Sequence, residues 1–179
     1  IVLLGHGGAG KTTLAEAILH RCGAISRMGS IEELSTVSDF EPEAKQHQHS
    51  TNSTLLFATS GQTELNVIDT PGHPEFVGYA LAALPAVETA VIVVNASTGV
   101  EHNTRRLFSA AGEAGLARMV VINKIDTVGV SQLRSLVDEL KEAFGSRLHC
   151  INLPSERGKD VVDCFDTESG IADLFSVRD

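Results

Sequence analysis

A glycine-rich segment near the start of the chain has the spacing of a phosphate-binding loop. Residues 5–12 fit the pattern G-x-x-x-x-G-K-[ST], between an apolar run and a helical pattern. Glycines let the backbone turn its N–H groups inward, and the lysine and the positive end of the following helix attract anions. This chemistry suits a nucleoside triphosphate, with the Thr12 hydroxyl on Mg²⁺. The residues expected at the nucleotide are Gly5, His6, Gly7, Gly8, Ala9, Gly10, Lys11, Thr12 and Thr13.

A second motif indicates which base is bound. The loop alone leaves this open, because its residues 7–12 also resemble the loop of partition-type ATPases. Asn123, Lys124 and Asp126 form N-K-x-D directly after an apolar run. A carboxylate there accepts hydrogen bonds from the ring N–H and exocyclic amine of guanine, whereas adenine would leave it unpaired. We therefore expect GTP rather than ATP, with the stem of Lys124 over the base and Asn123 bracing the phosphate loop.

A third motif, D-x-x-G, closes the apolar run that ends at Ile68. Asp69 is expected to hold Mg²⁺ through water, and the backbone N–H of Gly72 to contact the γ-phosphate. Loss of that contact on hydrolysis would release the following loop. His73 comes next and is the candidate catalytic residue, because phosphoryl transfer depends on orienting the attacking water. The alternative interpretation of His73 is a structural surface histidine.

The elements that must position these motifs alternate along the chain. Short β-rich runs and helical patterns follow one another, which is typical of βα units on a parallel sheet. The predicted strands are 1–4, 54–59, 64–68, 89–94, 119–122 and 148–153, and the predicted helices are 12–21, 76–84, 103–114 and 131–144. A short connection that contains Ser60, Gly61 and Gln62 joins the second and third strands, which predicts an antiparallel hairpin at the sheet edge. The expected fold class is an α/β P-loop NTPase: a mostly parallel sheet with one antiparallel edge hairpin and helices on both faces.

Length and pattern predict one main domain. We expect the nucleotide-binding domain to span 1–154, and 155–179 to be a tail or the start of an inserted subdomain, because the pattern weakens there. Residues 28–53 are polar and weakly periodic, which indicates a functional loop. Ile1 lies inside a predicted strand, so we expect the natural chain to begin earlier.

Composition narrows the function classes further. Hydrophobic residues make up 42% and charged residues 21% of the 179 residues, and no apolar run is long enough to span a bilayer. The formal net charge of -9 argues against broad adhesion to nucleic acid or to an acidic membrane. The three cysteines have no paired spacing, which favours a reducing, cytoplasmic location. We expect a monomer.

Taken together, the motifs resemble those of the translational GTPases. That superfamily is marked by G-H-x-x-A-G-K-T-T, D-T-P-G-H and N-K-x-D in this order, and the similarity covers most of the chain. Within it, residues 38–43, and 161–163 shortly after 152–154, look most like elongation factor G and elongation factor G-like proteins. The resemblance implies a GTPase that uses GTP/GDP and Mg²⁺ and acts on the ribosome.

Three departures from the family pattern limit what the resemblance implies. Gly8 stands where the family usually has an Asp that is implicated in holding a monovalent cation. The family's mobile loop ends in R-G-I-T, whose Thr ligates Mg²⁺, whereas this chain has Ser50 in register and Thr51 as the alternate. With Thr12 and Asp69, Ser50 completes the expected metal ligands. The S-A-[KL] segment that backs the base is absent, as if postponed by an inserted subdomain, so we expect weak nucleotide affinity.

Two other functions remain open from the sequence. The altered mobile loop and the missing Asp are compatible with a nucleotide-gated regulatory module that seldom hydrolyses its nucleotide. The glycine-rich loop is compatible with a partition-type ATPase, although N-K-x-D conflicts with that interpretation.

Overall fold

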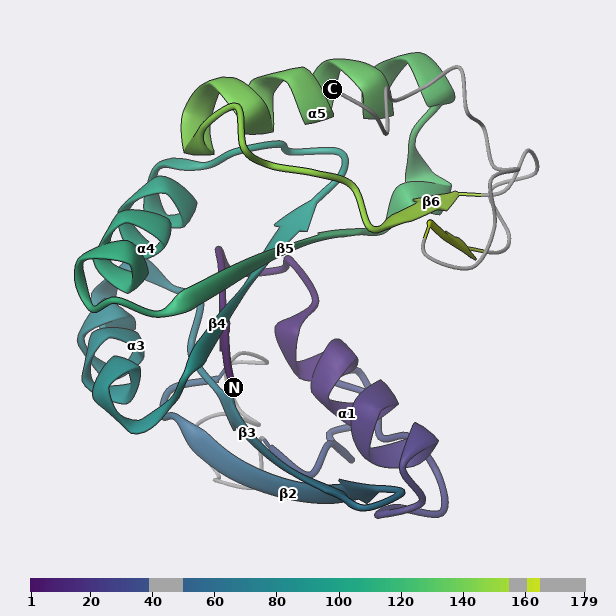
Figure 1. Cartoon of the computed structure of the whole chain (residues 1–179). Helices are drawn as coiled ribbons and strands as arrows, with labels where there is room; N and C mark the ends of the chain where they lie inside the picture. Colours follow the sequence, from purple (N-terminus) through teal and green to yellow (C-terminus); the bar gives the residue numbers. More distant parts are fainter. Residues whose placement is uncertain (39–49, 155–160, 165–179) are drawn as a thin grey trace. The chain divides into compact units, whose positions relative to one another are not determined.

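The computed structural model describes residues 1–38, 50–154 and 161–164 (Figure 1). Most of the elongation factor G-like motif at 38–43 and most of the expected tail at 155–179 lie outside the described residues. The chain forms two compact units. The first comprises Ile1–Val94 and Glu101–Asn123, and the second comprises Asn95–Val100 and Lys124–Asp179.

The first unit is built on a five-stranded sheet. Its strands are β1 (Val2–Leu4), β2 (Thr54–Ser60), β3 (Thr63–Asp69), β4 (Thr89–Asn95) and β5 (Ala117–Asn123). They lie in the order β2-β3-β1-β4-β5. Strand β1 pairs in parallel with both β3 and β4, and β2 pairs antiparallel with β3. The predicted fold class, a mostly parallel sheet with one antiparallel edge hairpin, is therefore confirmed.

The edge hairpin turns more tightly than the sequence suggested. Ser60 pairs with Thr63, so only Gly61 and Gln62 lie in the loop. Gly61 has a φ of +61°, which fits the left-handed backbone that two-residue hairpin loops require. Pairing then continues to Thr54 and Asp69, which brings the end of the D-x-x-G strand beside the start of β2.

Helices cover both faces of this sheet (Figure 1). Helix α1 (Lys11–Arg21) lies on one face, and α3 (Val77–Ala83) and α4 (His102–Glu113) lie on the other. The predicted helix 76–84 is α-helical only over α3, between the short 3₁₀ helices Pro74–Phe76 and Leu84–Ala86. Proline restricts the backbone at both ends. The core under α1 joins Ala15 and Leu19 to the inner side chains of the sheet.

The second unit contains α5 (Val130–Phe144) and a small hairpin of β6 (Asn152–Pro154) and β7 (Val161–Asp163). Leu133, Leu136, Val137 and Leu140 recur at spacings of three and four along α5 and are buried. The predicted strand 148–153 is wrong in its start and its partner. The Leu148 N–H donates to the Gly145 carbonyl in a turn, and β6 pairs with β7 rather than with the five-stranded sheet.

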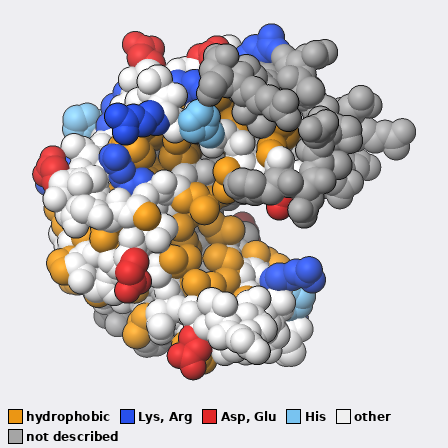
Figure 2. Space-filling view, in the orientation of Figure 1, with side chains coloured by type: hydrophobic (Ala, Val, Ile, Leu, Met, Phe, Trp, Pro, Cys, Tyr) orange, Lys and Arg blue, Asp and Glu red, His pale blue; other side chains and the backbone are white. Residues whose placement is uncertain are grey.

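The surface carries charges of both signs. On the face seen in Figure 2, acidic and basic side chains are separated by wide areas of uncharged residues. Within the described ranges, no helix is both long enough and apolar enough to cross a bilayer.

Candidate nucleotide and metal site

The phosphate loop connects β1 to α1 through left-handed glycines. Gly5, Gly8 and Gly10 have φ values of +141°, +75° and +95°. A Cβ at Gly5 would collide with the Val93 carbonyl oxygen, and one at Gly10 with Nδ2 of Asn123. The loop therefore needs glycine both for its backbone conformation and for its close packing.

The helix end that follows the loop suits an anion. Gly10 caps α1 without a side-chain hydrogen bond, and the first turn of α1 carries no acidic residue. The N–H groups of that turn and the helix dipole give this end a partial positive charge. Gly7, Gly8 and Thr13 are exposed, whereas Gly5 and Ala9 are buried. The loop thus presents its middle outward, as a cradle for phosphates must.

Lys11 is held over the loop by backbone carbonyls. Its Nζ donates to the carbonyl oxygens of Gly5 at 3.0 Å and His6 at 2.9 Å, and the residue is only 6% exposed. The third motif meets the loop at the same place. A Cβ on Gly72 would collide with Lys11 Nζ and come within 2.6 Å of the Gly7 backbone nitrogen. The structure therefore brings Gly72 directly against the phosphate loop.

The three expected metal ligands lie together. Thr12 Oγ1 donates to Asp69 Oδ2 at 2.7 Å and lies 3.3 Å from Ser50 Oγ. The parallel register that pairs Leu3 with Asp69 places this carboxylate at the end of β1, beside the loop. Two hydroxyls and a carboxylate are oxygen donors of the kind that Mg²⁺ prefers, so the donor set fits the ion. The described residues hold no cluster of three or more His, Cys, Asp or Glu side chains suited to a metal.

The N-K-x-D motif begins where β5 ends. Asn123 Nδ2 donates to the Ala9 carbonyl oxygen at 3.0 Å, across 114 residues of sequence. This hydrogen bond braces the phosphate loop in the way the sequence predicts for Asn123.

Lys124 and Asp126, which the sequence predicts to read the base, belong to the second unit. Lys124 has a φ of +59°, and its carbonyl accepts hydrogen bonds from the backbone N–H and the hydroxyl of Thr127. This closes a tight turn on which Asp126 is exposed. The local geometry leaves the carboxylate accessible to a ligand, and its role in base recognition stays a prediction.

His73 lies at the surface, at the start of the 3₁₀ helix Pro74–Phe76. Its side chain is 48% exposed. Nδ1 accepts the Glu75 backbone N–H at 3.4 Å and lies 3.8 Å from Glu75 Oε2. The ring is tilted against that of Phe76, with 6.0 Å between centroids. In this arrangement the imidazole caps the helix, and its catalytic role stays a prediction.

Sequence reasoning missed two residues at the start of α4. Glu101 Oε2 lies 3.0 Å from Nε2 of His6 in the phosphate loop. Asn103 is 5% exposed and donates from Nδ2 to the Gly72 carbonyl oxygen at 3.4 Å. Both contacts join residues far apart in sequence. The one signal in the sequence that could have indicated these two residues was their polar character at the start of a helix. That pattern is also typical of ordinary helix capping.

Comparison with known proteins agrees with this geometry. The family described as "Elongation factor Tu GTP binding domain" matches residues 1–173. An elongation factor G-like protein of Mycobacterium tuberculosis is 35% identical over 158 residues, which is 88% of this chain and 22% of that protein. The mitochondrial ribosome-releasing factor 2 of Candida dubliniensis is 32% identical over 154 residues, 86% of this chain and 19% of that protein.

A solved structure shows the same likeness. The crystal structure of a protein from Thermus thermophilus superimposes with a TM-score of 0.84 and 38% sequence identity, covering 90% of this chain and 24% of that one. The chain thus spans about a quarter or less of the length of these relatives. With the family match over nearly its whole length, the chain belongs to the GTP-binding domains of the elongation factor Tu type.

Proposed function

We propose that this domain binds GTP with Mg²⁺, hydrolyses it, and does so on the ribosome as part of an elongation factor G-like protein. The observation that carries the proposal is the hydrogen bond from Asn123 to the Ala9 carbonyl. It joins Asn123, the first residue of the guanine motif, to the phosphate loop.

Different residues of the site would bind the phosphates and the metal ion. Lys11 and the N–H groups of the loop would bind the β- and γ-phosphates, and Thr12, Ser50 and Asp69 would hold the ion. Mg²⁺ supplies charge neutralisation of those phosphates when bound. The 3.3 Å separation of the Ser50 and Thr12 hydroxyls favours Ser50 over Thr51 as the loop ligand.

Base choice is assigned to Asp126. We expect Asp126→Asn to weaken GTP binding strongly, because an amide presents a donor where guanine also presents donors. Competition of GTP and ATP against a fluorescent guanine nucleotide measures the preference. The matched control is Asp138→Asn, which makes the same change at an exposed position of α5. A guanine preference that survives in Asp126→Asn would refute the assignment.

The ribosome is proposed as the accelerating partner. The support is the family match and the name of a relative, ribosome-releasing factor 2. Phosphate release from GTP should rise several-fold or more when ribosomes are added to the whole protein, and release from ATP should stay at background. A rate of GTP hydrolysis unchanged by ribosomes would remove the ribosome from the proposal but leave the GTPase activity.

One alternative remains, a nucleotide-gated module that seldom hydrolyses GTP. The exposed, helix-capping position of His73 favours it. His73→Ala separates the two. We expect this variant to keep GTP affinity and to lose about a hundredfold or more in hydrolysis, if the imidazole orients water. An unchanged rate would support the alternative. The partition-type ATPase is not retained, because the matched family is one of GTP-binding domains.

A further inference from the structure

We propose that Glu16 is a positioning residue of the metal site. It holds a segment of the chain that contacts the start of β2, and this contact keeps Ser50 close to Thr12. The inference deepens the proposed function and rests on it, since it concerns the same Mg²⁺ ligands. We name residues 29–38 the post-helix segment.

Glu16 is a carboxylate buried against backbone N–H groups. It is 0% exposed on α1. Oε2 accepts the N–H of Gly29 at 2.7 Å, and Oε1 accepts the N–H of Val37 at 2.6 Å. Burying a carboxylate is costly unless hydrogen bonds satisfy it, and charge-assisted bonds of this length are strong. Glu16 therefore ties both ends of the post-helix segment to α1.

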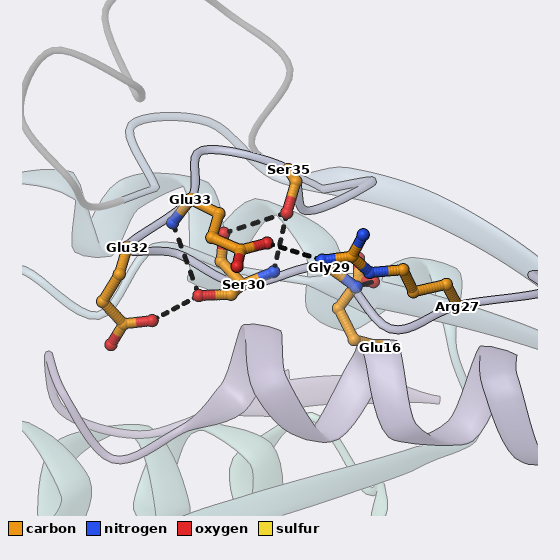
Figure 3. A network of polar contacts seen from close by, with 7 residues as sticks. All are labelled: Glu16, Arg27, Gly29, Ser30, Glu32, Glu33 and Ser35. Carbon is orange, nitrogen blue, oxygen red and sulfur yellow. Dashed lines mark hydrogen bonds and ion pairs between the residues drawn. The ribbon is translucent and has the colours of Figure 1, made fainter.

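The post-helix segment is itself a compact turn (Figure 3). Ser35 N–H donates to the Ser30 carbonyl at 3.1 Å, and Ser30 N–H donates to Ser35 Oγ at 3.0 Å. A Cβ at Gly29 would collide with the Ser35 backbone, so the turn packs closely against its anchor point. By contrast, the ion pair of Glu33 with Arg27, which precedes the segment, is exposed. The segment is therefore held together by its own hydrogen bonds, and Glu16 is a buried attachment of it to α1.

From this segment, contacts lead back to the metal ligands. The carbonyl of Ser38 accepts the Thr54 hydroxyl at 2.9 Å, at the start of β2. Thr54 lies four residues after Ser50, whose hydroxyl is 3.3 Å from Thr12 Oγ1. Thr12 and Glu16 are four residues apart on α1 and so share one helix face.

These contacts form a closed ring. It runs from Glu16 through Val37 and Ser38 to Thr54, then to Ser50, Thr12 and back along α1. Thr54 also pairs with Asp69, and Leu56 packs in the core under α1, so breaking one link removes one of several ties of β2. Ser50 then meets Thr12 less often. The expected consequence is a weaker contribution of Mg²⁺ to nucleotide affinity, while the phosphate loop itself is unchanged.

The test measures the magnesium-dependent gain, the ratio of affinities for a fluorescent, non-hydrolysable GTP analogue with Mg²⁺ and with EDTA. Glu16→Gln replaces one acceptor oxygen by an amide donor that faces an N–H group. We expect its gain to fall about tenfold, as for loss of a charge-assisted hydrogen bond, and its affinity in EDTA to stay at the wild-type value. Glu33→Gln, on the exposed side of the same turn, is the matched control and should keep the full gain.

A second variant covers the case in which Glu16→Gln does not fold. Thr54→Val removes the hydroxyl bonded to Ser38 but keeps the shape and the strand preference. Its gain should fall about threefold, as for a neutral hydrogen bond. Thr59→Val makes the same change at an exposed position of β2 and should have no effect.

The outcomes separate the inference from the proposed function. Folded Glu16→Gln or Thr54→Val with a wild-type gain, or with equal losses in Mg²⁺ and EDTA, would overturn the positioning role and leave the GTP site standing. A wild-type protein without any magnesium-dependent gain would instead contradict the proposed metal site, and the inference with it.

Discussion

At the scale of single residues, the glycines of the phosphate loop differ in what they require. Gly8 and Gly10 both have positive φ, but a Cβ at Gly8 would meet nothing within 4 Å. Space therefore does not explain why position 8 is glycine. Gly10 is different, because a Cβ there would displace Asn123 from its bond to Ala9.

A matched pair of alanine substitutions separates strain from packing. Gly10→Ala and Gly23→Ala both force alanine into a left-handed backbone, at φ +95° and +73°, and each should cost about 1–2 kcal/mol. Gly23 has open space, so its variant should bind nucleotide normally. Gly10→Ala should also lose the Asn123 brace and about tenfold or more in GTP affinity. Equal affinities of the two variants in a titration would contradict this account of Gly10.

At the scale of elements, the β2–β3 hairpin illustrates how register decides burial. Leu56 pairs with Val67, and both are buried at 6% and 0% exposed, whereas the preceding Leu55 is 68% exposed. Successive side chains of a strand point to opposite faces. A shift of one residue in pairing would therefore bury Leu55 and expose Leu56.

The same chemical change at two adjacent leucines tests this register. Leu56→Ala should lower the free energy of unfolding by about 2–5 kcal/mol, because it leaves a cavity beneath α1. Leu55→Ala should change it by less than about 0.5 kcal/mol, as at most surface positions. Urea denaturation of both variants gives the comparison. A larger loss for Leu55→Ala than for Leu56→Ala would show that the strand pairs differently.

At the scale of the whole molecule, nucleotide binding should stabilise the fold. A ligand that binds only the folded chain adds about 2.7 kcal/mol at a concentration of 100 times Kd. For a domain of this size that raises Tm by roughly 5–10 °C. Thermal unfolding with GTP and Mg²⁺ should show this rise, with ATP as the control. The same rise with ATP would contradict guanine selectivity.

The boundary of the GTP-binding domain stays a proposal. We propose that the GTP-binding domain ends at 154 and that 155–179 begin a tail or an inserted subdomain. The β6–β7 hairpin crosses this boundary, because Leu153 pairs with Val162. Limited proteolysis, followed by mass measurement of the stable product, locates the boundary.

The motifs, the alternation of strands and helices, and the edge hairpin could all be predicted from the sequence. These depend on local chemistry: glycines where the backbone must turn, a lysine and a hydroxyl at a helix start, and apolar runs with period two or about 3.6. The family resemblance followed from the order of the same motifs, and the comparisons bear it out.

The contacts between residues far apart in the sequence could not be predicted and are seen only in the folded chain. The contacts of Glu16 with Val37, Glu101 with His6, and Asn103 with Gly72 join positions that no periodicity links. In the sequence, Glu16 looks like any charged residue of a surface helix. The backbone N–H groups that make its burial possible come from a loop whose path depends on the whole fold. The pairing of β6 with β7, rather than with a strand of the five-stranded sheet, depends on the fold in the same way.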